Sequence, residues 1–342
     1  LLSFVVAFVS ASLVEYAPSM FQVTSRRKAL GVIAGVLATA AAIPMTVNLQ
    51  SSGEKFRVAA IQGNANAGLF AKTYPGEVLD NHLTVTRKMI SDGKAKGVQL
   101  VVWPENASDL NPEFSPRANL ELNSLVNREL KTPFTFGTIT ATESDIFNSS
   151  ILWLPNAGFA DQYDKKRPVP FAEYVPDRDF WYALAPDLIG LIYRGYTFGT
   201  RDPIFEIDGK PFGVLICFEI AIDESIQGLV DSGAKAILLQ SNNADFGRSD
   251  EAYQQLGVAR LRAIETGLPL INVSTTGPSG IFSSTGATLA EVPAFQPRFF
   301  AATINLRQSD TPAMSYGRYF DYANLIALGL LSISVIRRRA VS

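Results

Sequence analysis

The middle of the chain alternates short apolar runs with longer amphipathic segments. The apolar runs are rich in β-branched and aromatic residues and are bounded by turn-forming residues, which predicts β-strands. They span residues 57–62, 100–103, 134–140, 148–154, 212–216, 236–240, 270–273 and 299–304. The amphipathic segments predict helices over residues 79–96, 116–130, 222–232 and 251–266. Strands that alternate with helices indicate an α/β fold, in which helices cover a sheet.

Both ends of the chain are apolar without this alternation. Residues 29–48 are uncharged, which suits a transmembrane helix of about 20 residues, and a basic cluster at 26–28 places the start of that helix in the cytoplasm. Residues 1–15 are interpreted as the end of another membrane helix, whose earlier part would precede this sequence. Residues 319–336 are interpreted as a third membrane helix, extended by interfacial aromatic residues and followed by a cytoplasmic basic tail at 337–342. The domain between the spans, residues 56–310, is then expected on the extracytoplasmic side.

A secretion leader is the alternative interpretation of the first basic cluster. Arg26 and Arg27, a short apolar stretch and the small residues 38–42 are similar to a twin-arginine signal. We favour a membrane helix, because an apolar segment precedes the cluster and residues 319–339 form a second apolar segment with a basic flank.

Composition narrows the chemistry of the middle domain. The formal net charge of −2 argues against a nucleic-acid partner. Cys217 is the single cysteine and His82 the single histidine, so neither an intrachain disulfide nor a usual zinc site is expected. We expect His82 on the surface of the helix at 79–96. No phosphate-binding glycine motif is present, and we predict neither a metal nor a cofactor.

Three segments carry side chains with possible catalytic chemistry. Cys217 follows the apolar run 212–216, at the carboxyl end of a predicted strand, where α/β folds usually place their chemistry. Glu105 follows the run 100–103, and Lys165 and Glu173 lie in a proline-rich strip at 165–176. Taken singly, each has an ordinary explanation: a packed thiol, a solvated carboxylate and a surface charge cluster. Taken together, Glu105, Lys165 and Cys217 supply the base, cation and nucleophile of covalent acyl chemistry.

These segments resemble the Glu-Lys-Cys triad of the nitrilase, or carbon–nitrogen hydrolase, superfamily. The resemblance covers roughly residues 56–304 and includes the Asn-Ser pair at 148–149, the loop at 241–247 and the helix at 254–265. Within the superfamily, the strip at 165–176 is similar to that of the apolipoprotein N-acyltransferases. The resemblance implies a four-layer α-β-β-α sandwich flanked by membrane helices.

The resemblance also implies a reaction and partners. The family transfers an acyl chain from a membrane phospholipid to the amine of a diacylglyceryl-cysteine apolipoprotein, at the bacterial cytoplasmic membrane. Cys217 would form the thioester, Glu105 would act as the base, and Lys165 with the backbone N–H of Phe218 would stabilise the oxyanion. Glu173 would hold Lys165 and Glu105 in register or share their acid–base work. Glu219 would act as a structural acid or orient the cysteine loop.

The segment 177–199 is dense in aromatic and aliphatic residues and has few charges. One interpretation is an insertion packed into the core. The other is a lid that contacts acyl chains through Trp181, Leu188 and Ile192, with Phe246 in the loop at 241–247 as a further substrate contact. Two other functions stay open: a membrane-tethered amidase or nitrilase that uses water as acceptor, and a non-catalytic protein that keeps the fold.

Overall fold

The computed structural model describes residues 53–65, 68, 73–192, 195–319, 322, 325, 326 and 329. The chain divides into two compact units, Ser51–Asp310 and a second unit formed by Leu1–Gln50 with Thr311–Ser342. The membrane helices expected at 1–15 and 29–48, and the tail at 337–342, lie outside the described residues, as does most of 319–336. Among the residues that are described, no helix is both long and apolar enough to cross a membrane.

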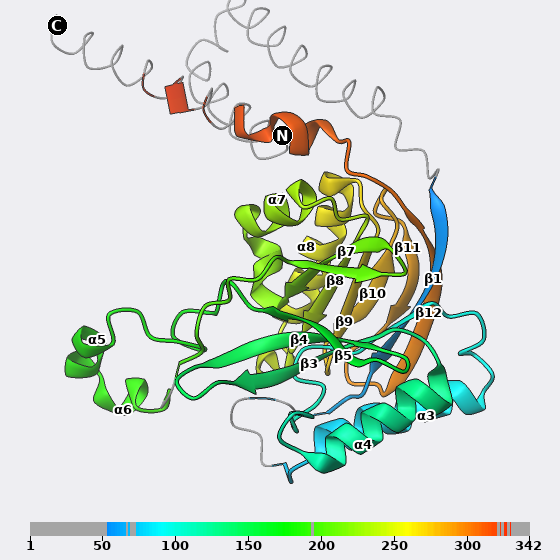
Figure 1. Cartoon of the computed structure of the whole chain (residues 1–342). Helices are drawn as coiled ribbons and strands as arrows, with labels where there is room; N and C mark the ends of the chain where they lie inside the picture. The colour runs from blue at the N-terminus through cyan, green and yellow to red at the C-terminus, as the bar shows by residue number, and fades with distance from the viewer. Residues whose placement is uncertain are drawn as a thin grey trace, which may run out of the picture. The chain divides into compact units, whose positions relative to one another are not determined.

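Two mixed six-stranded sheets form the centre of the unit Ser51–Asp310 (Figure 1). In the first sheet, β1, β2 and β3 are parallel and the outer strands are antiparallel. Its order is β12 (Arg298–Leu306), β1 (Glu54–Gln62), β2 (Leu100–Val102), β3 (Phe134–Ala141), β4 (Ile146–Leu154) and β5 (Gly158–Asp164). In the second sheet, β7, β8 and β9 are parallel. Its order is β11 (Thr288–Val292), β10 (Ser279–Phe282), β9 (Leu270–Ser274), β8 (Ala236–Ser241), β7 (Lys210–Ile216) and β6 (Ile204–Ile207).

The main apolar core lies between the two sheets. Alternate side chains of β1 show why residues 58–61 form an unbroken apolar run: Phe56, Val58 and Ala60 belong to the cluster shared with β7, β8 and β9. Ala59 and Ile61 point to the opposite face, where they join a second buried cluster with helical residues such as Leu79. Since side chains alternate along a strand, a strand buried on both faces must be apolar at nearly every position.

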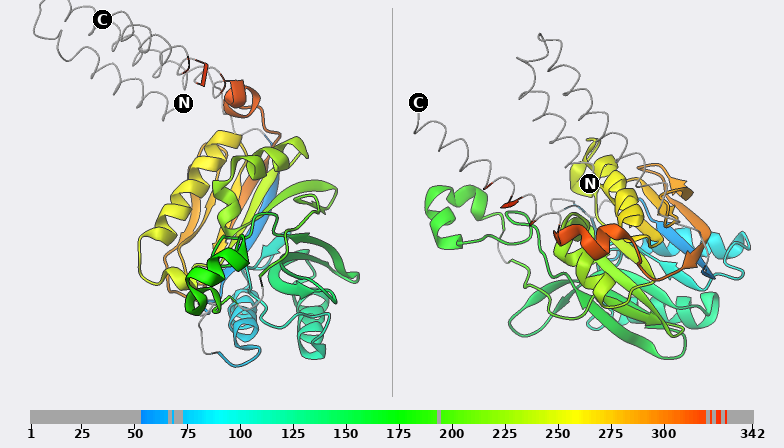
Figure 2. Two further views of the ribbon diagram at one scale, coloured as in Figure 1. Left: turned by 90° about the vertical axis from the view of Figure 1, so that its left-hand side faces the viewer. Right: turned by 90° about the horizontal axis from the view of Figure 1, so that it is seen from above.

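Helices cover the outer face of each sheet, which gives the predicted α-β-β-α layers (Figure 2). The first sheet carries α3 (Glu77–Ser91) and α4 (Pro116–Ser124), the latter continuing into a π-helical turn, Leu125–Leu130. The second sheet carries α7 (Asp223–Asp231) and α8 (Glu251–Thr266). Two short helices, α5 (Arg178–Leu184) and α6 (Pro186–Ile189), lie apart from both sheets in Figures 1 and 2.

The prediction for His82 is wrong. His82 lies on α3 as expected, but its side chain is fully buried and its ring packs 5.4 Å from that of Trp103. Its Nδ1 lies 2.8 Å from the carbonyl oxygen of Val78, and burial lowers the pKa of the imidazole to about 4. His82 therefore faces the sheet as a neutral ring, because the apolar stripe of α3 is wide enough to include it.

Candidate active site

Glu105 and Cys217 each follow a central strand in a left-handed backbone turn. Glu105 comes after β2, and the next residue, Asn106, has φ of 51°. Cys217 comes directly after β7, has φ of 52° and opens a short 3₁₀ turn, Cys217–Ala221. Non-glycine residues in this region cost on the order of 1–3 kcal/mol, and such residues cluster at functional sites. Each turn ends the backbone hydrogen bonding of its strand, so the side chains of Glu105 and Cys217 leave the alternating arrangement of the sheet.

Gly137 lets the Glu105 loop lie directly against β3. A Cβ at position 137 would come within 2.5 Å of the backbone nitrogen of Asn106 and 2.6 Å of the Cα of Glu105. The glycine N–H donates to the carbonyl of Pro104 over 2.9 Å. Only a residue without a side chain permits this approach, so Gly137 contributes to the position of Glu105.

Lys165 lies at the end of β5 and is almost fully buried, with 1% of its surface exposed. Its Nζ donates to Glu173 over 2.9 Å and to Glu105 over 3.3 Å. Burial opposes the charged ammonium, but the charges of Glu105 and Glu173, and that of the Cys217 thiolate when it forms, outweigh it and hold the Lys165 pKa above its ordinary value. Lys165 is therefore a cation at neutral pH.

Asn148 and Asn242 complete the surroundings of Glu105. The Asn148 Nδ2 donates to Glu105 over 2.6 Å and to Glu173 over 2.9 Å, so one amide joins both carboxylates. The backbone N–H of Asn242 donates to the other oxygen of Glu105 over 2.6 Å. The sequence analysis assigned no role to either asparagine. For Asn148, the available signal was an amide side chain within a strand that is otherwise mostly apolar, where a buried polar group needs a hydrogen-bond partner.

The electrostatics of the site raise the pKa of both Glu105 and Cys217, which makes Glu105 a stronger base and the Cys217 thiol a weaker acid. Burial raises the pKa of Glu105, Glu173 raises it further, and Lys165 and the hydrogen bonds from Asn148 and Asn242 oppose the rise. Burial and the charge of Glu105 raise the pKa of the Cys217 thiol to about 12, while Lys165 lowers it. At neutral pH the resting nucleophile is therefore a thiol that needs a base, and a glutamate with a raised pKa is a better base than a solvated one.

Cys217 also receives a hydrogen bond that the sequence analysis missed. The Nε2 of Gln255, on α8, donates to Sγ over 3.5 Å. Phe218, next along the 3₁₀ turn, is 37% exposed and lies at the surface beside the nucleophile.

Glu219 connects the 3₁₀ turn Cys217–Ala221 to the proline-rich strip at 165–176, which we call the lysine strip. Its Oε2 accepts from the N–H of Ile216 over 2.9 Å, and its Oε1 accepts from the hydroxyl of Tyr163 and the N–H of Lys166, each over 2.8 Å. Burial raises the pKa of Glu219, and the bonds from Ile216 and Tyr163 oppose the rise. These contacts join the turn that opens at Cys217 to β5 and the residues after it, and the role of Glu219 as a structural acid or as an orienter of the cysteine loop stays a prediction.

Most of the segment that contains α5 and α6 is exposed, although Ile189 on α6 is buried, and this exposure argues against the core-packed interpretation. No residue of α5 is buried, and Leu188 on α6 is 67% exposed. Trp181 is 37% exposed and packs edge-to-face on Phe171 of the lysine strip, with ring centroids 5.2 Å apart. Ile192 is half-buried. We call this exposed segment, residues 177–192, the apolar arm. Phe246 is half-buried in a separate 3₁₀ turn, Ala244–Phe246.

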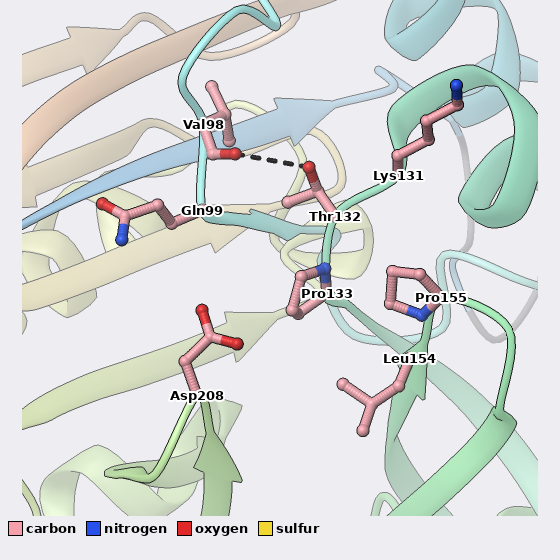
Figure 3. A pocket seen from close by; sticks show the side chains of 8 residues that line it. All are labelled: Val98, Gln99, Lys131, Thr132, Pro133, Leu154, Pro155 and Asp208. Atoms are coloured by element: carbon pink, nitrogen blue, oxygen red, sulfur yellow. Dashed lines mark hydrogen bonds between the residues drawn. The ribbon is translucent and has the colours of Figure 1, made fainter.

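An open depression on the described part of the chain lies away from these residues (Figure 3). Its volume is about 470 Å³, and it is lined by residues that include Gln99, Lys131 and Asp208. These precede β2, β3 and β7, so the depression lies at the amino ends of the strands whose carboxyl ends lead to Glu105 and Cys217. Among the described residues, no three side chains of metal-binding type lie together.

Comparison with known proteins identifies relatives for most of the chain. Residues 57–311 match the family model described as carbon-nitrogen hydrolase. Apolipoprotein N-acyltransferases of Mycolicibacterium smegmatis and Shewanella oneidensis are 30% and 28% identical to the chain, and the matches cover 82% and 99% of it. The chain spans 48% of the first relative and 65% of the second.

Solved structures share the fold at low sequence identity. A crystal structure of an amidase from Nesterenkonia sp. superposes with a TM-score of 0.55 at 16% identity, covering 79% of this chain and 97% of the amidase. Another structure of a Nesterenkonia amidase, from the nitrilase superfamily, gives a TM-score of 0.57 at 15% identity. The sandwich of two six-stranded sheets is thus the fold of that superfamily.

Proposed function

We propose that this chain, which belongs to the carbon–nitrogen hydrolase family, transfers an acyl chain from a membrane phospholipid to an apolipoprotein. The acceptor is the amino-terminal amine of a diacylglyceryl-cysteine, and the acyl group passes through a thioester on Cys217. The observation that carries this proposal is the buried Lys165, held between Glu105 and Glu173 within electrostatic reach of the only thiol. The names of the relatives support the choice of substrates.

In the first half-reaction, Glu105 takes the proton from Cys217 as the sulfur attacks the ester carbonyl of the phospholipid. A carbon–sulfur bond forms, and Lys165 with the N–H of Phe218 stabilises the oxyanion. The carbon–oxygen bond then breaks, and the proton on Glu105 passes to the departing alkoxide. The products are a lysophospholipid and the Cys217 thioester, so the protons and electron pairs balance.

In the second half-reaction, the amine of the acceptor attacks the thioester carbonyl. Glu105 takes the proton that the amine loses, a carbon–nitrogen bond forms, and the carbon–sulfur bond breaks. The same proton returns to the sulfur of Cys217. Glu173, which holds Lys165 over 2.9 Å, keeps the ammonium in place through both steps.

The apolar arm supports a lipid donor. Large apolar side chains such as Leu188 and Leu184 are 67% and 64% exposed, and contiguous exposed patches of this kind usually mark an interaction surface. We therefore propose that the arm contacts lipid through Trp181, Leu188 and Ile192, and that Phe246 contacts substrate. We further propose that residues 1–15 are the end of a membrane helix and that 29–48 and 319–336 are membrane helices. The domain at 56–310 would then work on the extracytoplasmic face of the cytoplasmic membrane.

Replacing Trp181, Leu188 and Ile192 with serine is expected to impair acylation of Cys217 by phospholipid vesicles. The variant should keep acylation by a short, water-soluble thioester, because the arm delivers lipid and does not touch the reacting atoms. Acyl-enzyme formation with each donor, measured by intact mass spectrometry, separates the two. Loss of both reactions would mean that the arm supports the fold of the site. Retention of both would mean that the arm takes no part in delivering the phospholipid donor.

The rate of thioester formation is expected to fall with decreasing pH through the raised pKa of Glu105. The base must be a carboxylate to accept the thiol proton, so activity is present above that pKa and is lost below it. The acid limb should therefore lie above the value of about 4.3 typical of a solvated glutamate. Single-turnover rates between pH 4 and 9 measure it. A rate that rises tenfold per pH unit up to pH 9 would instead indicate a free thiolate mechanism without Glu105.

Hydrolysis is the alternative outcome, since the solved relatives are described as amidases. The enzyme supplied with phospholipid and a diacylglyceryl-cysteine peptide should yield N-acylated peptide and lysophospholipid. Free fatty acid without N-acylated peptide, or cleavage of simple amides in place of acyl transfer, would favour a hydrolase.

A further inference from the structure

The hydrogen bonds around Cys217 point to a catalytic residue outside the Glu-Lys-Cys set. We propose that Gln255 stabilises the thiolate of Cys217 by donating to it, and that Asn243 and Ser274 fix the amide in the donating orientation. The part that concerns acyl transfer rests on the function proposed above, whereas the part that concerns the thiolate does not.

Gln255 contacts the nucleophile from helix α8, whereas the charged residues Glu105 and Lys165 follow strands of the first sheet. Its Nε2 lies 3.5 Å from Sγ, within hydrogen-bond distance for sulfur. An amide presents either its oxygen or its nitrogen, and only the nitrogen stabilises a thiolate, so the orientation of the amide decides what Gln255 does.

A chain of hydrogen bonds determines this orientation. The backbone N–H of Gly277 can only donate, and it donates to Oγ of Ser274 over 3.0 Å. The Ser274 hydroxyl then gives its one proton to Oδ1 of Asn243 over 2.6 Å. Asn243 is left with its Nδ2, which donates to Oε1 of Gln255 over 2.5 Å. With its oxygen already engaged, Gln255 turns its Nε2 to the sulfur.

The two middle members of this chain of hydrogen bonds are closely confined and shielded from water. Ser274 is fully buried and Asn243 is 2% exposed, so water does not compete for their hydrogen bonds. A Cβ at Gly277 would lie 2.5 Å from Oδ1 of Asn243, which shows how closely the backbone confines that side chain. The donor on Gln255 is therefore in place before the thiolate forms, as electrostatic preorganisation requires.

Gln255 complements the charged groups that face the sulfur. Glu105 and Glu173 raise the pKa of the thiol, and Lys165 lowers it. Lys165 must also stabilise the oxyanion of the substrate, so it cannot serve the sulfur alone. Gln255 is a second, neutral donor that can stay hydrogen-bonded to the sulfur through both half-reactions. The same donor favours departure of the thiolate when the amine has attacked the thioester.

Alkylation of Cys217 tests the inference directly, because it is the only cysteine in the chain. The probe is iodoacetamide, and the variants are Gln255→Leu, which removes the donor, and Gln255→Glu, which replaces it with an acceptor. Loss of one hydrogen bond to an ionised sulfur should raise the apparent thiol pKa by about one unit. The alkylation rate of Gln255→Leu should accordingly fall about tenfold at each pH below that pKa, and that of Gln255→Glu should fall further.

Two further variants make the result decisive. Gln254→Leu is the matched control, since Gln254 is the neighbouring glutamine on α8, is exposed, and should leave alkylation unchanged. Ser274→Ala leaves Gln255 in place but removes the proton that fixes Asn243, so it should slow alkylation by a smaller factor. Thermal unfolding identifies variants that do not fold.

An alkylation rate of folded Gln255→Leu equal to that of the wild type would overturn the inference. If that variant does not fold, an unchanged rate in Ser274→Ala overturns it instead. Incubation of the wild type with phospholipid vesicles separates this question from the proposed function. Slowed alkylation in the variants, with no acyl adduct in the wild type, would support the role of Gln255 and contradict acyl transfer. Unchanged alkylation in the variants, with an acyl adduct in the wild type, would support acyl transfer and contradict the role of Gln255.

Discussion

Replacing Cys217 with serine is expected to abolish acyl transfer from phospholipid to a diacylglyceryl-cysteine peptide. A serine hydroxyl is far less acidic than a thiol, so Glu105 is too weak a base to generate the nucleophile at neutral pH. The measurement is the yield of N-acylated peptide from membranes that contain each protein. Substantial triacylation by the serine variant would contradict a covalent mechanism through Cys217.

The Cys217→Ser variant should retain its fold, which makes its loss of activity interpretable. The change preserves shape, and serine accepts the same positive φ at the same modest cost as cysteine. Cys217 is buried, so the control is a thermal unfolding curve close to that of the wild type. Equal amounts of both proteins in the membrane fraction complete the control.

Lys165→Ala and Glu105→Ala are each expected to lower the rate of thioester formation by roughly a hundredfold or more, the usual cost of losing an oxyanion donor or a general base. Lys165 is the cation between the buried Glu105 and the half-buried Glu173, and Glu105 is the carboxylate with the raised pKa. Formation of the acyl-enzyme in a single turnover measures the effect on chemistry without the later steps.

Lys166→Ala provides the matched control for Lys165→Ala. Lys166 is the adjacent lysine, is half-buried, and reaches Glu219 through its backbone N–H, which the substitution keeps. Its rate should stay close to that of the wild type. A large loss in Lys166→Ala with little loss in Lys165→Ala would contradict the assignment of the cation. Because removing one partner of a buried ion pair typically costs about 3–5 kcal/mol, unfolding curves must accompany the Lys165 and Glu105 rates.

The buried central strands could be predicted from the sequence because they are apolar on both faces. The run before Cys217 was predicted at 212–216 and is observed as Lys210–Ile216, and the helix predicted at 251–266 is observed as Glu251–Thr266. The placement of Glu105 and Cys217 at strand ends followed from these runs. The position of Lys165 beside Glu105 was predicted from the family resemblance and not from periodicity, because Lys165 follows β5, which is not adjacent to β2 in the sheet.

Edge strands and half-buried contacts could not be predicted in the same way. β5 has a polar sequence and β6 only four residues, so neither carries a strong strand pattern. His82 was placed on the surface because a lone histidine gives no sign of which helix face it occupies. The bond from Gln255 to Cys217 joins residues 38 positions apart and depends on side-chain orientation, which no sequence pattern encodes.

Mass spectrometry of the protein purified from bacterial membranes tests the central claim most directly. The thioester mechanism predicts an added fatty acyl mass on the peptide that contains Cys217, removed by hydroxylamine and absent from Cys217→Ser. Incubation with a diacylglyceryl-cysteine peptide should discharge it, with the acyl group recovered as an amide on that peptide. A Cys217 peptide that stays unmodified when phospholipid is present and acceptor is absent would contradict the account.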